Sequence, residues 1–587
     1  MSWKLKKKCL DILAGEEGYV RKVWGDALTI CLAYPNVYRT GMSNLGFQAV
    51  YALINRHPGC LCERVFLPDP GDAAAHRASS SPLFSLESQR PLADFDLVAF
   101  SLSFENDYPN ILTLLEMAGI PLETEARGES DPLVIGGGIA ATLNPEPLAD
   151  FFDLFLIGEG EALLPDFLDA AVALRGQLTR EPFLDRIQRS ISGAYVPRFY
   201  RVSTDPDGRI AAREPLDAAF PAKIVRRSAP DVNAFTTEQG ITTEATEFGG
   251  LFLTEVSRGC ARGCRFCAAG FVCRPARFRS AATLEESFRR GLEKRKTIGL
   301  LGTAVSDHPE LIPLCRSILS RGGSFAVGSL RLDRLSEPMA ALLKETGVET
   351  LSLAPEAGSQ RLREVIKKGI SEEEIFSAVD NLLKYDMVRL RLYFMVGLPT
   401  ETDEDVEAIV RLVKGMEHRA RQSSAGKKGF RHLTLSINQF IPKPATPFQW
   451  HPLEDVAVVK RRIRRIADGL RGEKAVSVTH DLPKWNYIQA LLSLGDRRVG
   501  KLLMAVHRCG GNWAQAFREV NVNPDFYVYR RKDTGEILPW DFIDTGVEKA
   551  LLAREYRKAM GNGESIAACP LDASQMGTDS KSVPVKP

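Results

Sequence analysis

Three closely spaced cysteines are the residues best suited to chemistry in this chain. Cys260, Cys264 and Cys267 follow an apolar stretch, residues 251–256, with the spacing C-x3-C-x2-C. Three thiolates on one loop can bind three irons of a four-iron cluster, which leaves the fourth iron without a protein ligand. A metal with a vacant position is built to bind a substrate or cosubstrate, as catalytic zinc sites illustrate. The spacing therefore predicts an iron–sulfur site that is open to a small ligand.

Sites with four protein ligands remain the alternative. A structural zinc site or an electron-transfer cluster normally has four such ligands, and Cys273 follows Cys267 closely enough to be the fourth. A four-cysteine electron carrier or iron–sulfur scaffold therefore stays open. Gly259, Gly263 and Gly270 favour the open site, because glycine permits a tight loop and a closely approaching ligand.

The cysteine motif, with the aromatic Phe266 directly before its last cysteine, resembles that of the radical SAM superfamily. In that superfamily the open iron binds the amino and carboxylate groups of S-adenosylmethionine, and an electron from the reduced cluster cleaves the sulfonium. The resulting 5′-deoxyadenosyl radical abstracts a hydrogen atom. The resemblance implies a 4Fe-4S cluster on Cys260, Cys264 and Cys267, S-adenosylmethionine beside Phe266, and a reductant such as flavodoxin or ferredoxin as a partner. The cofactor supplies the radical chemistry, and the protein binds and orients it.

Short apolar runs alternate with helical segments after this loop. Strands are expected at 297–305, 324–330, 350–354, 389–396 and 433–440, the last of these being the final strand. Strands that alternate with helices indicate a parallel sheet, closed or half-closed, whose ligands lie at the carboxyl ends of the strands. Together with the resemblance, this predicts a partial (β/α)6 radical SAM barrel over residues 246–470.

Residues at the ends of these strands match the superfamily's ligand-contacting positions, at least loosely. The resemblance implies contacts with S-adenosylmethionine from Gly302, Thr303, Ser329, Arg331, Glu356 and Gly397. Glu356 would accept hydrogen bonds from the ribose, or else serve as a negative charge at a helix N-terminus. Arg331 would bind a carboxylate in a bidentate manner, or else pair with Asp333. Thr400 stands where the superfamily's Gly-x-Pro-Gly turn has its second glycine.

Residues 1–202 show a different α/β pattern. Apolar runs at 27–33, 95–103, 133–138 and 152–158, with a helix at 46–55, predict a doubly wound, Rossmann-like sheet. Such a sheet binds ligands in the crevice beyond its strand ends.

This first domain resembles the cobalamin-binding domain that precedes many radical SAM domains, through residues 135–142, 144–147 and 157–161. That domain often carries Asp-x-His-x-x-Gly, whose histidine binds cobalt; here Asn36 and Tyr38 replace the first two residues. A tyrosine with a pKa of about 10 is a poor cobalt ligand near neutral pH. Cobalamin bound without histidine and a docking platform without cobalamin both stay open. The residues that the resemblance places near cobalamin are Tyr38, Gly41, Ser101, Gly136, Gly137 and Gly138.

The remaining segments are expected to connect or to support these domains. Residues 203–245 are a polar connector, residues 471–560 a mainly helical C-terminal module, and residues 561–587 a disordered tail. A basic helix at 456–470 would contact nucleic acid or form a solvated face; the net charge of only +2 gives no indication of nucleic-acid binding.

Apolar segments and cysteine content indicate the cellular compartment of the protein. No apolar run approaches the ~18 residues needed to span a bilayer. Eleven cysteines, three of them in a candidate iron–sulfur loop, fit a reducing cytoplasm. The sequence therefore predicts a cytoplasmic radical SAM enzyme. Radical group transfer, with methylation or methylthiolation as the leading types, follows by analogy with the domain order of radical SAM methyltransferases. Cobalamin-independent rearrangement, cyclisation or oxidation is the alternative, and the substrate stays unidentified.

Overall fold

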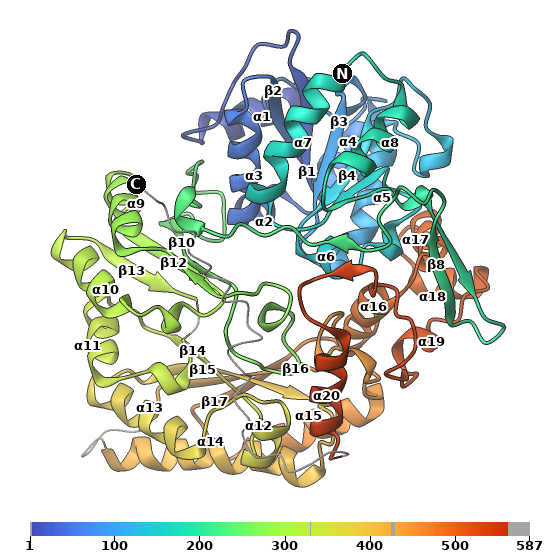
Figure 1. Ribbon diagram of the computed structural model, residues 1–587. Coiled ribbons are helices and arrows are strands. Elements are labelled where there is room, and N and C mark those ends of the chain that lie inside the picture. The colour runs from blue at the N-terminus through green and yellow to red at the C-terminus, as the bar shows by residue number, and fades with distance from the viewer. Residues whose placement is uncertain (1–2, 329, 424–428, 562–587) are drawn as a thin grey trace, which may run out of the picture.

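The computed structural model describes residues 3–328, 330–423 and 429–561. Two α/β domains lie one above the other, and the C-terminal helices pack beside both (Figure 1). The expectations for Ser329 and for the tail after residue 561 lie outside the described residues. Within the described chain, no helix is both long and apolar enough to cross a membrane.

The first domain contains a sheet with the order β2-β1-β3-β4-β5-β6, in which every pair is parallel except β5 with β6. Its strands are β1 (Leu28–Tyr34), β2 (Cys60–Phe66), β3 (Leu97–Ser101), β4 (Leu133–Gly137), β5 (Leu154–Leu156) and β6 (Ala194–Tyr195). Its helices are α1 (Trp3–Ala14), α2 (Tyr38–Met42), α3 (Leu45–Arg56), α4 (Pro70–Ala78), α5 (Tyr108–Ala118), α6 (Ile139–Leu143), α7 (Gly160–Leu174) and α8 (Arg180–Ser190). The chain passes from β1 to β2 and then to β3 on the opposite side of β1. The doubly wound sheet thus has its switch point, where ligands bind in such folds, between β1 and β3.

The second domain is a barrel sheet that is open on one side, with parallel strands apart from the short β11 (Arg277–Phe278), which pairs antiparallel with β10. β10, β12 and β13 are hydrogen-bonded neighbours, as are β14, β15, β16 and β17, and a bridge between Leu330 and Leu353 links the two groups. The strands are β10 (Leu251–Arg258), β12 (Thr297–Gly302), β13 (Ser324–Val327), β14 (Leu351–Glu356), β15 (Arg389–Val396), β16 (His432–Gln439) and β17 (Val476–His480). The helices outside it are α9 (Ala281–Lys294), α10 (Leu311–Ser320), α11 (Glu337–Glu345), α12 (Gln360–Val365), α13 (Glu372–Lys384), α14 (Asp403–Ser423) and α15 (Val456–Leu470). The fold class predicted from the sequence is confirmed.

One expected feature of the barrel is wrong. The strand at 433–440 is not the final one, because β17 pairs in parallel with β16 beyond the expected domain boundary at residue 470. Only Val476 and Val478 of this strand pack against the core, and its other residues are mostly exposed. An edge strand with so short an apolar pattern is hard to recognise from sequence.

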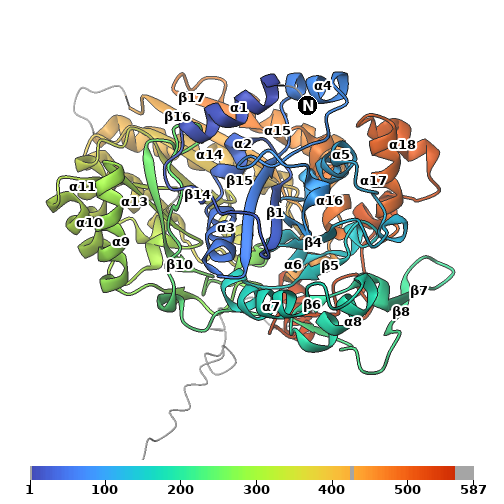
Figure 2. The same ribbon diagram turned by 90° about the horizontal axis from the view of Figure 1, so that it is seen from above.

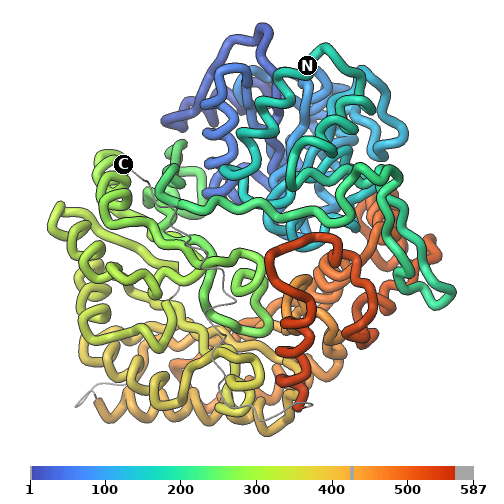
Figure 3. The backbone as a smooth tube through the Cα atoms, in the orientation of Figure 1, coloured from blue at the N-terminus to red at the C-terminus, as the bar shows by residue number. Residues whose placement is uncertain are grey.

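The connector and the C-terminal module join the two domains. The connector contains the hairpin β7 (Tyr200–Thr204) and β8 (Ile210–Pro215), followed by β9 (Ile224–Val225), which pairs with β18 (Ile543–Asp544). Figure 3 shows this part of the chain running between the first domain and the barrel. The C-terminal helices are α16 (Pro483–Leu494), α17 (Val499–Arg508), α18 (Trp513–Glu519), α19 (Asp525–Val528) and α20 (Lys549–Ala559).

The hydrophobic core of the first domain continues into the C-terminal helices, since Leu491, Leu502 and Val528 belong to the same buried cluster as Phe151 and Leu148. Seen from above in Figure 2, α9, α10 and α11 lie on one side of β1, and α17 and α18 lie on the other. The C-terminal module therefore supports the first domain as well as the barrel.

Candidate functional site

The three cysteines of the motif lie on the loop that follows β10. Gly259 starts the loop with φ +77°, and a Cβ at this position would lie 2.0 Å from the carbonyl oxygen of Cys273, so only glycine fits. Cys260 and Cys264 are buried and Cys267 is half-buried. The Cys267 N–H donates to the carbonyl oxygen of Cys264 at 3.0 Å, which folds the end of the loop into a turn.

The three thiols influence one another electrostatically. Burial raises the pKa of Cys264, and it raises the pKa of Cys267 to about 11; negative charge on the neighbouring cysteines of the motif adds to both shifts. Iron binding would therefore release protons from these thiols. Among the described residues, no three His, Cys, Asp or Glu side chains are arranged to share one metal ion. A four-iron cluster differs, since each thiolate binds its own iron, and three neighbouring thiols on one loop fit it.

Arg265, between two of these cysteines, fixes the loop to the rest of the molecule. Its backbone N–H donates to Ile366 O at 3.0 Å, and its Nη1 donates to Val365 O at 2.7 Å. Its Nε donates to Glu555 Oε2 on α20 at 3.0 Å. The neighbouring Phe266 packs against a separate buried cluster that includes Phe271. The loop is thus held by α12, by α20 and by a hydrophobic contact.

Arg331 and Glu356 lie near enough to the cysteine loop for their charges to change the pKa of the Cys264 thiol. The Arg331 and Lys368 cations act to lower the pKa of that thiol, and the Glu356 carboxylate acts to raise it. Glu356 ends β14 and accepts a hydrogen bond from Lys368 Nζ at 3.0 Å, and Arg331 Nε donates to Asp333 at 2.9 Å. The predicted pair of Arg331 with Asp333 is therefore present.

The N-terminus of α12 is capped by a side chain other than Glu356. Ser359 is the N-cap, and its hydroxyl accepts a hydrogen bond from the Leu362 N–H at 3.1 Å. The Glu356 carboxylate is instead paired with Lys368, in a half-buried position beside the cysteine loop.

The turn after β15 has the backbone of a glycine turn. Gly397 has φ +81°, and its N–H donates to Glu401 Oε2 at 2.7 Å. Thr400 has φ +64°, a conformation that favours glycine, which is the residue the superfamily's turn has here. Glu401 is buried beside Arg462, whose Nη1 lies 2.8 Å from Glu401 Oε2. Burial raises the pKa of Glu401 to about 7, although Gly397 and Arg462 act in the opposite direction.

A cavity of about 670 Å³ lies between the first domain and the barrel. The predicted residues that line it are Ser101, Gly136, Gly137, Gly138, Gly302 and Thr303. The wall formed by the first domain is otherwise mostly aliphatic, with Leu53, Leu163 and Leu164 among its residues. Strand ends of both domains thus face one space.

Glycine is required at two of the lining positions. A Cβ at Gly138 would lie 2.6 Å from Leu102 O, and one at Gly136 would lie 2.9 Å from the ring of Phe155. These glycines therefore allow close packing within the sheet while leaving the cavity free of side chains.

Tyr38 and Gly41 are not among the residues that line this cavity. The Tyr38 hydroxyl donates to Glu16 Oε1 at 2.5 Å, and its ring packs edge-on against Phe66. Gly41 lies against the same Phe66 ring, which a Cβ would approach to 2.5 Å. Both residues contribute to packing inside the first domain.

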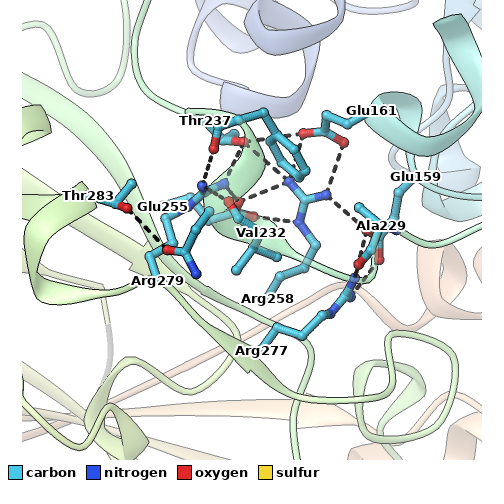
Figure 4. A network of polar contacts seen from close by, with 12 residues as sticks. Glu159, Glu161, Ala229, Val232, Thr237, Glu255, Arg258, Arg277, Arg279 and Thr283 are labelled. Carbon is cyan, nitrogen blue, oxygen red and sulfur yellow. Dashed lines mark hydrogen bonds and ion pairs between the residues drawn. The ribbon is translucent and has the colours of Figure 1, made fainter. Parts of the chain in front are cut away.

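The polar end of the cavity is an ion-pair network that joins the two domains (Figure 4). Glu161 accepts hydrogen bonds from both Nη atoms of Arg258, at 2.9 and 3.0 Å. Glu159 accepts from Arg277 Nη2 at 2.6 Å and from Arg258 Nη1 at 3.1 Å. Burial acts to raise the pKa of Glu159, but hydrogen bonds from Arg277 and the charge of Arg258 outweigh it and lower the pKa. The ion pairs of Glu159 and Glu161 with the barrel were not predicted, although both residues belong to the motif at 157–161.

Cys273 belongs to this network rather than to the cysteine loop. It lines the cavity, and the charges that act on its thiol come from Arg226, Glu159, Arg277 and Arg258. The structure therefore brings three cysteines together and directs Cys273 towards the cavity.

Two arginines of the basic helix α15 pair with acidic residues on α14 and on the segments before these two helices. Arg465 Nη1 lies 2.9 Å from Asp403 Oδ2, and Arg462 is paired with Glu401 and Glu454. These pairs neutralise part of the charge that suggested a nucleic-acid contact.

Two protein-family models match the chain. The model described as radical SAM proteins, N-terminal, matches residues 46–197, and the model described as radical SAM superfamily matches residues 254–413, which include the cysteine loop. The chain belongs to the radical SAM superfamily. The superfamily predicted from the cysteine motif is confirmed.

Two relatives are similar in sequence. The uncharacterised protein MJ0966 of Methanocaldococcus jannaschii is 28% identical over 81% of this chain and 90% of its own length. The uncharacterised methyltransferase PH0819 of Pyrococcus horikoshii is 34% identical over 89 residues, which are 15% of this chain and 19% of that protein.

Two solved structures are similar in outline. The radical SAM methyltransferase TsrM from Kitasatospora setae, with cobalamin and a [4Fe-4S] cluster, aligns with a TM-score of 0.45 and 16% identity over 70% of this chain and 72% of its own. The cobalamin-dependent radical enzyme OxsB, with aqua-cobalamin and S-adenosylmethionine, aligns with a TM-score of 0.43 and 14% identity over 66% of this chain and 52% of its own.

Proposed function

We propose that this radical SAM enzyme holds a 4Fe-4S cluster on Cys260, Cys264 and Cys267 and cleaves S-adenosylmethionine reductively. The proposal depends on three thiols that lie on one loop beside the polar strand ends of the barrel, whereas Cys273 lines the cavity between the domains. When bound, the cluster and S-adenosylmethionine supply the electron transfer and the 5′-deoxyadenosyl radical.

The residues around the loop divide the binding of S-adenosylmethionine among them. Gly302 and Thr303, at the end of β12, offer backbone groups to the methionine amino group, and Arg331 offers its guanidinium to the carboxylate. Glu356 accepts hydrogen bonds from the ribose hydroxyls, while Lys368 holds its carboxylate in place. The positive-φ turn at Gly397 lets the backbone approach the adenine.

The cavity between the domains would hold the substrate. Gly302 and Thr303 line this cavity, so the site for S-adenosylmethionine opens directly into it. Its aliphatic wall excludes water from the reacting centre, which protects a radical from side reactions. Methyl or methylthio transfer is the reaction that we favour, and the match to a short segment of a protein named as a methyltransferase supports it.

In this proposal, cobalamin would lie against the wall of the cavity formed by the first domain. This wall lies at the strand ends around the switch point, and Ser101 and Gly136 to Gly138 leave it open. Tyr38 supplies no lower ligand there, because it is hydrogen-bonded to Glu16 and does not line the cavity. Cobalamin would therefore bind without a protein ligand from this position. The electron donor in this proposal is a flavodoxin or a ferredoxin in a reducing cytoplasm.

Anaerobic purification tests the proposal. Iron, sulfide and corrinoid contents are measured first, and the reduced protein is then incubated with S-adenosylmethionine. We expect about four irons per chain, bound corrinoid, and formation of 5′-deoxyadenosine and methionine. Cleavage without corrinoid would leave a cobalamin-independent radical enzyme. A stable cluster that is unaffected by S-adenosylmethionine would contradict the proposal and favour an electron carrier.

A further inference from the structure

Arg226 is a buried cation with unused hydrogen-bond donors at the polar end of the cavity. Its side chain is 7% exposed, and the residue lines the cavity. Its Nη2 donates to Arg274 O at 2.8 Å, but its Nε has no hydrogen-bond partner. Its Nη1 lies 3.6 Å from Glu159, beyond hydrogen-bonding distance. A buried guanidinium without these bonds is costly unless a ligand completes them.

Glu159 cannot serve as the full partner of Arg226, because stronger donors occupy both its oxygens. Oε1 accepts from Arg277 Nη2 at 2.6 Å, and Oε2 accepts from Arg277 Nη1 at 2.9 Å and from the Ala229 N–H at 3.1 Å. Arg258 also donates to Oε2. The carboxylate is therefore neutralised by arginines other than Arg226.

The network as a whole has one positive charge more than it has negative charges. Its ion pairs join three carboxylates to four guanidiniums. The carboxylates are Glu159, Glu161 and Glu255, and the guanidiniums are Arg226, Arg258, Arg277 and Arg279. Burial raises the pKa of the Cys273 thiol, which keeps this neighbour of Arg226 neutral. Two guanidiniums of this network, Arg226 and Arg279, have an Nε without a partner among the described residues, and of these two Arg226 lines the cavity.

Ser257 provides a second unused polar group in the lining of the same cavity. The residue is 2% exposed, and its hydroxyl has no hydrogen-bond partner among the described residues. It lies on β10 against Gly302, where a Cβ would come within 2.5 Å of Ser257 Oγ. A hydroxyl and a guanidinium that are buried and unpaired in one cavity together indicate a missing acceptor.

We propose that the cavity binds a monoanionic carboxylate ligand with an apolar body. The carboxylate accepts hydrogen bonds from Arg226 and Ser257, while the apolar body lies against Val272 and Leu301 on the barrel side of the cavity. A single surplus positive charge matches a carboxylate better than a phosphate monoester, which carries up to two negative charges. The binding of this ligand is independent of the proposed function. Its role as the substrate of the radical reaction rests on the proposed function.

Decanoate is a suitable probe, with decanol as the neutral analogue and decyl phosphate as the dianionic one. Dissociation constants are measured by titration calorimetry on the anaerobically purified full chain. We expect decanoate to bind at least about tenfold more tightly than decanol, because a charge-assisted pair is added, and more tightly than decyl phosphate. Arg226→Gln should remove the preference for decanoate over decanol.

Arg227→Gln is the matched control. Arg227 is the next residue and is not among those lining the cavity; its Nη2 donates to Ala162 O and pairs with Asp166. This variant should keep the preference. If Arg226→Gln does not fold, Ser257→Ala replaces it: loss of an unpaired hydroxyl should preserve folding and weaken decanoate several-fold more than decanol.

The outcomes separate this inference from the proposed function. Equal binding of decanoate and decanol to the unmodified protein, or an unchanged preference in Arg226→Gln, would overturn the carboxylate site. Tighter binding of decyl phosphate than of decanoate would contradict the proposal that the ligand is a monoanion. If decanoate binds as expected while the reduced protein forms no 5′-deoxyadenosine, the carboxylate site stands and the proposed radical chemistry fails.

Discussion

Glu159 Oε2 lies 3.1 Å from Arg258 Nη1, and this ion pair joins the first domain to the last residue of β10. The cysteine loop begins directly after that strand. The contact that docks the two domains is therefore made by the strand that positions the cluster ligands, and the geometry of the cavity depends on it.

Glu159→Gln should destabilise the protein substantially. The substitution leaves Arg258 and Arg277 without one buried carboxylate, and breaking a buried pair typically costs about 3–5 kcal/mol. We expect a lower melting temperature and faster proteolysis at the connector. Glu247→Gln is the control, because Glu247 pairs with Arg39 on the surface and such pairs contribute about 1 kcal/mol or less. Equal effects of the two variants would contradict the role of Glu159.

Alanine in place of Cys260, Cys264 or Cys267 should abolish stable cluster binding. Cys273→Ala should retain it, because the Cys273 thiol lies among the interface arginines. Iron content and visible absorbance after anaerobic reconstitution measure both effects. Loss of the cluster in Cys273→Ala would revive the four-cysteine alternative.

Glu356→Gln should weaken the binding of S-adenosylmethionine by about tenfold, since the ribose loses a charged acceptor. The variant also leaves Lys368 without its carboxylate. Equilibrium binding to the reconstituted protein provides the measurement. Glu349→Gln, which removes only the exposed pair with Arg389, should bind S-adenosylmethionine normally. An unchanged dissociation constant in Glu356→Gln would remove Glu356 from the site.

Thr400→Gly and Gly397→Ala should change stability in opposite directions. Thr400 has φ +64° and Gly397 has φ +81°, and a side chain in this region costs roughly 1–2 kcal/mol. Glycine at 400 should therefore raise the melting temperature. Alanine at 397 should lower it further than backbone strain alone, because its Cβ would lie 2.8 Å from Glu454 Cβ. If both variants change the melting temperature in the same direction, the turn has adopted a different backbone conformation and the prediction is wrong.

Glu401 should make stability depend on pH. Its pKa rises from an ordinary value of 4.5 to about 7 in the folded chain, so between these values the folded state holds more protons than the unfolded state. Stability therefore falls as pH rises from 4.5 to 7, by at most about 3 kcal/mol. Glu401→Gln removes this dependence, and its melting temperature should gain on the unmodified protein from pH 5 to 8.

The difference between the two proteins is the quantity to follow, because another group acts in the opposite direction. Burial lowers the pKa of His451 from 6.5 to about 4. That shift reduces stability as pH falls from 6.5 to 4, and it is present in both proteins. A difference that stays constant with pH would show that Glu401 is ionised in the folded state.

Much of the barrel could be predicted because its signals are local. The strand at 389–396 and the helix at 456–470 have the predicted bounds, and Ser371 and Glu374 form a capping box at the start of α13. Buried parallel strands are continuous apolar runs, and caps depend on residues a few positions apart. In the first domain, β2 is fully buried but was not among the predicted strands.

The contacts that assemble the site could not be predicted, because they join distant parts of the chain. The pairs of Glu161 with Arg258 and of Arg265 with Glu555 span 97 and 290 residues. A charged residue gives no local sign of its partner. Tyr38 shows the same limit: its place in a motif suggested a cofactor contact, while the structure pairs it with Glu16.

The bond between Arg265 and Glu555 also bears on the order of events during biosynthesis. Translation produces the cysteine loop 290 residues before its partner on α20. The loop therefore leaves the ribosome with one of its braces missing, and a truncated chain that lacks the last helix never acquires it. Iron–sulfur delivery before the chain is complete meets a loop without this brace, whereas delivery afterwards meets the finished one.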